Sequence, residues 1–157
     1  MKGNKKIGWI GFFLCASLWG APYTDNGNGT VTDTATGLVW QKCSRGQGTT
    51  VGNCTTGSAT TSSWTSAITY CEGLTLGSRS DWRLPNINEL RSIVDYVKSS
   101  SPTIDSTSFP NTQSGGYWSS SNYIFGGGVS WLVLFDYGVV TSGPNTFNSY
   151  VRCVTGP

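Results

Sequence analysis

The chain has 157 residues, of which 11% are charged and 37% hydrophobic, with 21 glycines, seven tryptophans and no histidine. This length predicts one ordinary-sized domain, and the lack of histidine excludes Ser-His-Asp and Cys-His catalysis and imidazole-ligated metal or haem sites. Low charge combined with abundant Trp, Tyr, Ser, Thr, Asn and Gly indicates a β-rich extracellular fold rather than a coiled coil or a disordered tail.

The N-terminus is typical of a secretory signal peptide. A basic head containing Lys2, Lys5 and Lys6 precedes an apolar run over residues 7–18, which is shorter than the roughly 20 apolar residues that a membrane anchor needs. We therefore expect residues 1–20 to be removed and residues 21–157 to form a single exported domain without a membrane span. The remaining seven basic and eight acidic residues nearly balance, so nucleic-acid binding by bulk charge is excluded.

Asn-Gly and Thr-Gly pairs separate short β-prone runs between Tyr23 and Cys43, which predicts a β-hairpin. The stretch 25–29 faintly resembles a calcium loop. Glycines stand where alternate carboxylates belong, however, so a turn is favoured over a cation site. Residues 44–62, rich in Gly, Thr and Ser, are expected to form a loop.

Cysteines at positions 43, 54, 71 and 153 remain after the signal peptide, and an even number in an exported chain predicts two disulfides. Three pairings are open. Pairing Cys43 with Cys54 would close a small loop and leave Cys71 with Cys153 to tie a helix to the C-terminal strand. The alternative of a four-thiolate metal site lacks any Cys-x-x-Cys spacing, so we expect no metal and no cofactor.

Two helices are predicted in the middle of the chain. Ser63 is the expected N-cap of the first, which should end at Gly73 to Gly77. Asn86 and Glu89 form a capping-box signature for the second. The expected buried faces are Trp64, Ala67, Ile68, Cys71 and Leu74 in the first helix, and Ile87, Leu90, Ile93, Val94 and Val97 in the second.

The C-terminal third predicts four strands, over residues 117–120, 129–135, 139–141 and 150–154, taken as successive antiparallel neighbours. That order brings two loops, 121–128 and 143–149, to one edge of a sheet. Aromatic residues interleaved with Asn and Ser on loops of a rigid sheet are typical of recognition surfaces, although the rings could instead fold back onto the core. The candidate ligand-binding residues are Asn122, Tyr123, Phe125, Asn145, Phe147 and Asn148.

Several motifs taken together resemble one family, named for the C-terminal domain of Lcl, a collagen-like bacterial adhesin. These motifs are DNGNGTVTD at 25–33, GLVWQ at 37–41, DWRLPN at 81–86 with Glu89 and Leu90, FPN at 109–111, YWSS at 117–120 and YVRCV at 150–154. The resemblance implies an α+β, C-type-lectin-like fold in which two helices flank a twisted antiparallel sheet. It also implies a disulfide from the first helix to the last strand, here Cys71 to Cys153.

The stretch from Trp82 to Pro85, with Glu89, also resembles formylglycine-generating enzymes, which depend on a cysteine pair at the active site. Because all four cysteines are read as structural here, we interpret Trp82, Arg83 and Glu89 as structural too, with Arg83 and Glu89 forming a partly buried ion pair at the helix start.

The function expected from the sequence is that of a secreted, non-enzymatic binding or adhesion module of a bacterial cell surface or periplasm. It would recognise an extracellular glycan or protein through the two loops. A structural interaction domain of a cell-surface assembly is the alternative, and an oxidoreductase of the formylglycine-generating type is a weaker one. In the adhesin the domain is associated with trimers and sulfated glycans. This chain has no collagen repeat, so its self-association stays open.

Overall fold

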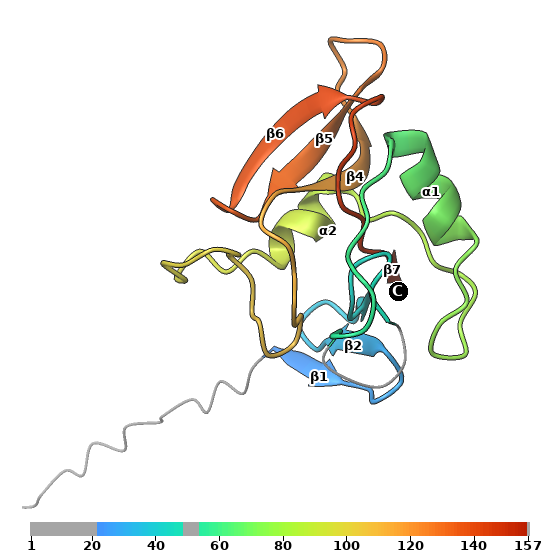
Figure 1. The fold of residues 1–157 in the computed structure, drawn as a ribbon, viewed down its shortest axis with the longest axis vertical. Helices are drawn as coiled ribbons and strands as arrows, with labels where there is room; N and C mark the ends of the chain where they lie inside the picture. Colours follow the sequence, from blue (N-terminus) through green and yellow to red (C-terminus); the bar gives the residue numbers. More distant parts are fainter. Residues whose placement is uncertain (1–21, 49–53, 157) are drawn as a thin grey trace, which may run out of the picture.

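The computed structural model describes residues 22–48 and 54–156, and over this part the chain is an α+β fold with two antiparallel sheets, two helices and two disulfides (Figure 1). The predicted signal peptide, with Cys15, lies outside the described residues. Where one twisted sheet is expected from the family resemblance, the strands divide into a four-stranded and a three-stranded sheet.

The first sheet has the order β1-β2-β3-β7 and is built from β1 (Tyr23–Asp25), β2 (Thr30–Asp33), β3 (Val39–Gln41) and β7 (Val154–Thr155). The hairpin predicted in this region is the β1–β2 pair, extended by β3. The polar side chains between β1 and β2 form hydrogen bonds within their own turn. Asp25 accepts a hydrogen bond from the Gly27 N–H at 3.0 Å, and Asn28 accepts one from the Thr30 hydroxyl at 2.7 Å. Within the described part of the chain, no group of three or more acidic or Cys side chains is placed to hold a metal ion.

The second sheet has the order β4-β5-β6, formed by β4 (Gly116–Asn122), β5 (Val129–Leu134) and β6 (Val139–Pro144). The prediction that residues 150–154 form its fourth antiparallel strand is wrong. Tyr150 meets Tyr117 in an isolated parallel bridge, and β7 pairs with β3 of the first sheet. The chain leaves the second sheet because the carbonyl groups of Val151 and Cys153 accept hydrogen bonds from Arg45 and Gln41 instead.

The helices are α1 (Trp64–Glu72) and α2 (Ile87–Ser92). Helix α2 begins with the predicted capping box, but it ends earlier than the apolar stripe suggests. Asp95 causes this early end, because its carboxylate accepts hydrogen bonds from the N–H groups of Val97 and Lys98 and turns the chain. Val97 is consequently 94% exposed. Neither helix in the described residues has the length and apolar composition needed to cross a bilayer.

The three-stranded sheet lies between two hydrophobic clusters. Successive residues of a strand point to opposite faces, so Tyr117 enters one cluster and Trp118 the other. Leu90 of α2 belongs to the Tyr117 cluster, and Ala67 of α1 belongs to the Trp118 cluster. The two faces of this sheet are therefore covered by different helices, and its β5 strand is central.

The C-terminal segment, residues 149–155, joins both sheets and both helical regions. The Trp118 N–H of β4 donates to Tyr150 at 3.0 Å, and the Gln41 N–H of β3 donates to Cys153 at 2.9 Å. Val154 exchanges two backbone hydrogen bonds with Arg83, which precedes α2. In Figure 1 this dark red segment runs from the loops beside β4 down to the first sheet.

Arg152 of the C-terminal segment is completely buried. Its guanidinium lies 4.8 Å from the ring centroid of Phe109 and 5.6 Å from that of Tyr117, and it donates to the Thr112 hydroxyl at 2.9 Å. Burial lowers the pKa of the guanidinium, because desolvation disfavours the charged form. Among the described residues no carboxylate pairs with it, so the aromatic faces take the place of a counter-ion.

The disulfides pair Cys43 with Cys54 and Cys71 with Cys153, which confirms the pairing considered first. Their sequence separations are 11 and 82 residues. The second bridge fixes α1 to the C-terminal segment, and both of its cysteines are fully buried.

We predict that the two bridges differ in their contribution to stability. Replacing Cys71 and Cys153 by Ser should lower the free energy of unfolding by about 4 to 5 kcal/mol, since the loop that it releases is long. The Cys43→Ser/Cys54→Ser protein should lose only about 3 kcal/mol. Urea unfolding of the three proteins measures the difference. Equal losses would contradict the assignment of the main constraint to the longer loop.

Candidate functional site

Two loops meet at one end of the β4-β5-β6 sheet. The β4–β5 loop spans residues 123–128, and the segment after β6 spans residues 145–149. The Asn145 N–H donates to the Gly128 carbonyl at 2.7 Å, which continues the β5–β6 register beyond the strands. We call this end, with both loops, the loop edge; it is the top of the molecule in Figure 1. The tight turn at Tyr137 lies at the opposite end of the same strands.

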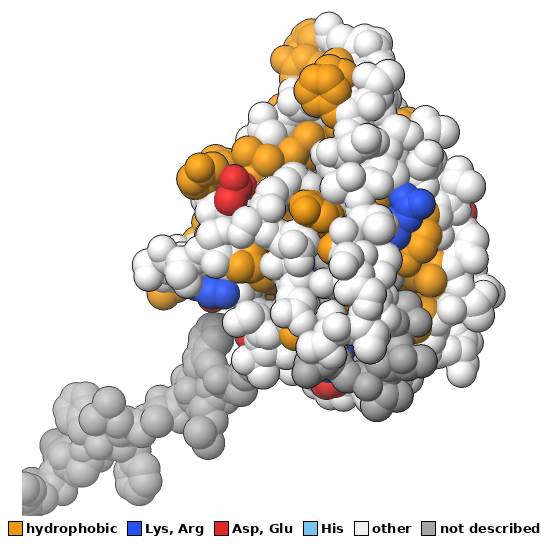
Figure 2. All heavy atoms as spheres, viewed as in Figure 1, with side chains coloured by type: hydrophobic (Ala, Val, Ile, Leu, Met, Phe, Trp, Pro, Cys, Tyr) orange, Lys and Arg blue, Asp and Glu red, His pale blue; other side chains and the backbone are white. Residues whose placement is uncertain are grey.

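The loop edge carries large exposed apolar side chains. Ile124 is 83% exposed, Phe125 82% and Phe147 62%. Figure 2 shows hydrophobic atoms gathered at this end of the molecule. Ile124 was not among the candidate residues from the sequence, because those were chosen from the aromatic and asparagine residues of the two loops.

Tyr123 holds the β4–β5 loop against the sheet. Its ring packs edge-on against Trp131 of β5, with centroids 5.1 Å apart, and Phe125 packs against Tyr123 at 5.8 Å. Trp131 and Val140 continue this surface into a groove of about 300 Å³ beside α2. Arg91 also lines the groove, and within the described part of the chain it forms no ion pair. Neither Trp131 nor Arg91 was selected from the sequence.

Phe147 lies on the other face of the sheet. A Cβ atom placed on Gly143 would lie 3.9 Å from the Phe147 ring and next to Leu132. The Phe147 ring therefore lies on the same face as Leu132. Leu132 follows Trp131 along β5, so the two side chains point to opposite faces. The two loops therefore share one edge, but their rings present two adjoining surfaces.

The asparagines of the predicted site differ in their surroundings. Asn148 and Asn122 are exposed, and Asn122 accepts a hydrogen bond from the Ser130 hydroxyl at 3.2 Å. Asn145 accepts a backbone hydrogen bond from the Trp64 N–H, and its side-chain oxygen is buried. Asn145 thus positions the loop by joining it to α1 and to the β4–β5 loop.

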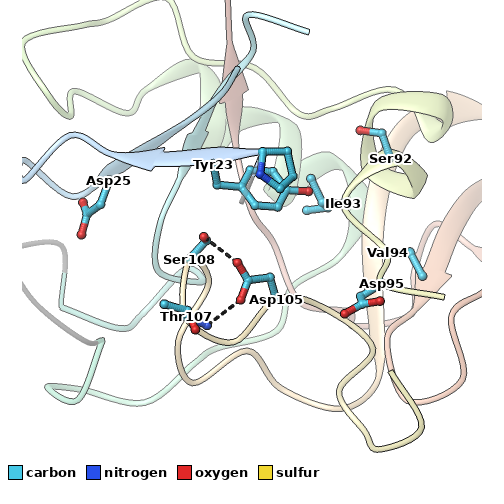
Figure 3. A pocket seen from close by; sticks show the side chains of 10 residues that line it. Tyr23, Asp25, Ser92, Ile93, Val94, Asp95, Asp105, Thr107 and Ser108 are labelled. Carbon is cyan, nitrogen blue, oxygen red and sulfur yellow. Dashed lines mark hydrogen bonds between the residues drawn. The ribbon is translucent and has the colours of Figure 1, made fainter. Parts of the chain in front are cut away.

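A separate pocket of about 720 Å³ lies beside β1, between the segment after α2 and residues 105–108 (Figure 3). Tyr23 and Ile93 form part of its wall, and Asp25, Asp95 and Asp105 line it. Burial, followed by the negative charges of Asp33, Asp105 and Asp95, raises the pKa of Tyr23 to about 12. Sequence reasoning missed this pocket because residues far apart in the sequence form it.

The Asp105 carboxylate in this pocket is already used by its own loop. It accepts hydrogen bonds from the Thr107 N–H at 2.9 Å and the Ser108 hydroxyl at 2.7 Å, both drawn in Figure 3. Asp25 pairs with Lys42. These contacts give the carboxylates of the pocket a structural role in the adjoining turns.

The residues expected to be structural lie together at the start of α2. Trp82 is buried and donates to the Leu76 carbonyl at 3.2 Å. Both Nη atoms of Arg83 donate to the Glu89 carboxylate at 2.7 Å, and the Asn86 N–H donates to the same carboxylate at 2.8 Å. This arrangement fixes the entry to α2, while the Arg83 backbone pairs with the C-terminal segment.

The pKa of Glu89 reflects two opposing effects. Burial raises the pKa of its carboxyl, but the hydrogen bonds from Arg83 and Asn86, together with the positive charge of Arg83, outweigh burial and lower the net pKa. The carboxylate is therefore ionised in the folded protein, and it serves as both the partner of Arg83 and the cap of the helix.

The state of the cysteines is relevant to the alternative of an oxidoreductase of the formylglycine-generating type. A formylglycine-generating reaction depends on a reactive cysteine pair, whereas Cys43, Cys54, Cys71 and Cys153 are all buried and joined as disulfides. The four described cysteines are therefore all engaged in disulfides.

The family model for the Lcl C-terminal domain matches residues 29–155. A comparison with curated proteins gives no match.

We predict a pH-dependent coupling between Arg83 and Glu89. Because the folded-state pKa of Glu89 is lowered, the ion pair stabilises the fold above the unfolded pKa and loses this effect as the pH falls through the folded pKa. A double-mutant cycle on the free energy of unfolding, with Arg83→Met and Glu89→Gln, should give a coupling energy of about 1 kcal/mol at pH 7. The coupling is small because Arg83 is partly exposed. The coupling should shrink as the pH falls below the ordinary pKa of a glutamate and the carboxyl becomes protonated. A coupling that is unchanged at acidic pH would rule out this ion pair as its source.

Proposed function

The chain belongs to the Lcl C-terminal domain family, and on that premise we propose that it is a non-enzymatic binding domain of a bacterial cell surface. It contacts an extracellular glycan or protein through the loop edge. The observation that carries this proposal is the exposure of Ile124, Phe125 and Phe147 together at one end of a rigid sheet. Exposed apolar side chains that gather in one place are typical of interaction sites.

The chemistry of the loop edge suits a ligand with both apolar and polar faces. Aromatic rings can stack on the apolar face of a sugar or on an apolar side chain, and the amides of Asn122 and Asn148 can donate and accept hydrogen bonds. Asn145, with the side-chain oxygen buried, is proposed to position the edge. The contact residues of the proposal are Asn122, Tyr123, Phe125, Phe147 and Asn148, to which we add Ile124.

Contacts within the protein also hold the loop edge in one conformation. The hydrogen bond between Asn145 and Gly128, and the packing of Tyr123 on Trp131, hold the loops before a ligand arrives. A surface that is already ordered loses less conformational entropy when it binds.

We further propose that the fold is C-type-lectin-like and that the protein acts outside the cytoplasm after removal of residues 1–20. Two helices on opposite faces of the β4-β5-β6 sheet, and the disulfide from α1 to the C-terminal segment, support the first proposal. Two disulfides support the second, since disulfides persist in oxidising compartments.

The proposal is tested with the purified, oxidised protein on a glycan array. Phe125→Ala and Phe147→Ala should each weaken binding by about tenfold or more, because truncating a central exposed ring removes the main apolar contact. Tyr96→Ala is the matched control: Tyr96 is 67% exposed, and it follows Val94, which lies beside Gly138 at the end of the sheet opposite the loop edge.

Hits that survive both Phe substitutions, or that disappear in Tyr96→Ala, would place the site elsewhere. If no glycan on the array is bound, the proposed ligand is a protein. The same three variants are then compared in pull-down experiments from an outer-surface protein fraction.

A further inference from the structure

Strand β6 is an open edge of the three-stranded sheet. In the order β4-β5-β6, β5 covers one side of β6, and Figure 1 shows its other side facing outward. The far side of β4, by contrast, is bonded to Tyr150, and the Ser120 N–H donates to Pro85. The unpaired edge of this sheet is therefore β6.

The hydrogen-bonding register shows which backbone groups face outward. Asn145 donates to its opposite residue Gly128, and bonded pairs alternate along an antiparallel ladder. The odd-numbered residues of β6 are thus bonded to β5. Val140 and Ser142 direct their N–H and C=O groups away from the sheet, available to a further strand.

β6 lacks the usual protection of an edge strand. Its sequence VVTSGP contains no charged side chain and no bulge against β5, and Pro144 stands only at its end. Native proteins commonly block exposed edges with Lys, bulges or short strands. The outer strand of the other sheet, β1, has only three residues and carries Asp25.

Exposed apolar side chains lie at both ends of β6 on one face. Val139 is 47% exposed and Phe147 62%. Val139 shares its face with Gly143, because alternate strand residues point the same way, and the Phe147 ring lies against that face at Gly143. An antiparallel copy of the strand would bring Val139 of one molecule to Phe147 of the other, twice by symmetry.

The charge of the protein also permits self-association. The whole sequence has ten basic and eight acidic residues, and without Lys2, Lys5 and Lys6 it has seven basic and eight acidic residues, so the net charge is small in either form. Two copies therefore repel each other weakly. A self-complementary strand with apolar residues at both ends and no net charge fits a second copy better than it fits a charged peptide.

We propose that two molecules pair through their β6 strands, antiparallel and related by a two-fold axis, to form one continuous six-stranded sheet. The interface is isologous. Val140 and Ser142 exchange backbone hydrogen bonds with the partner, and Val139 packs on the partner's Phe147. Tyr123 and Phe125 lie on the other face, so each copy keeps these two rings for a ligand, whereas Phe147 is covered by the partner and is open to a ligand only in the monomer. The inference does not depend on the proposed function.

Analytical ultracentrifugation of the oxidised protein over a concentration series tests the proposal. A strand of this length buries less than the roughly 800 Å² per partner of a standard interface, so we expect a weak dimer with a Kd of about 10–100 µM. Val139→Lys should weaken it by tenfold or more, since a charge enters the contact with Phe147. Val97→Lys is the matched control, because it makes the same change at an exposed Val outside β6.

Amide hydrogen exchange gives a second readout that needs no substitution. Exchange at Val140 and Ser142 should slow as concentration rises, whereas Thr141, already bonded to β5, should exchange slowly throughout. A monomer at about 1 mM would overturn the proposal. So would a dimer that Val139→Lys leaves intact, or one in which the Val140 and Ser142 amides exchange at the same rate at all concentrations.

Discussion

The hydrogen bonding and covalent attachment of the C-terminal segment, residues 149–155, hold this fold together. The segment donates to or accepts from β3, β4 and the stretch before α2, and the Cys71–Cys153 bridge ties it to α1. Two small sheets would each have too little core to be stable alone. Because one strip of backbone contacts both, the two sheets share their burial and are expected to fold as one unit.

The C-terminal segment also fixes the position of the loop edge. Ser149 exchanges two backbone hydrogen bonds with Ser62, just before α1, and the Asn145 carbonyl accepts from Trp64. The loop that carries Phe147 is therefore held between α1 and the C-terminal segment, and the β4–β5 loop is held to it in turn through Gly128. A binding surface on loops gains its definition from the scaffold beneath it, and here that scaffold is closed by a disulfide.

Local patterns in the sequence predict the helices, the capping box at Asn86 and three of the four C-terminal strands. They do not predict contacts between residues that are distant in the sequence. The strand at 150–154 looks like a continuation of the sheet, and only its bonds to Gln41 and Arg45 reveal that it crosses to the other one. Burial of Arg152 between two rings, and the pocket lined by Tyr23 and Asp105, likewise depend on contacts that no spacing encodes. The strand order alone predicts that the two loops meet, whereas the placement of their rings on two faces depends on tertiary packing that the order does not encode.

Hydrogen exchange on the Cys71→Ser/Cys153→Ser protein is the most direct test of this dependence on the C-terminal segment. If the segment couples the two sheets, the amides of Trp118 in β4 and Gln41 in β3 should lose protection together, relative to the oxidised protein. Loss of protection in one sheet, with the other sheet as protected as before, would show that the sheets are stable independently and would contradict the account.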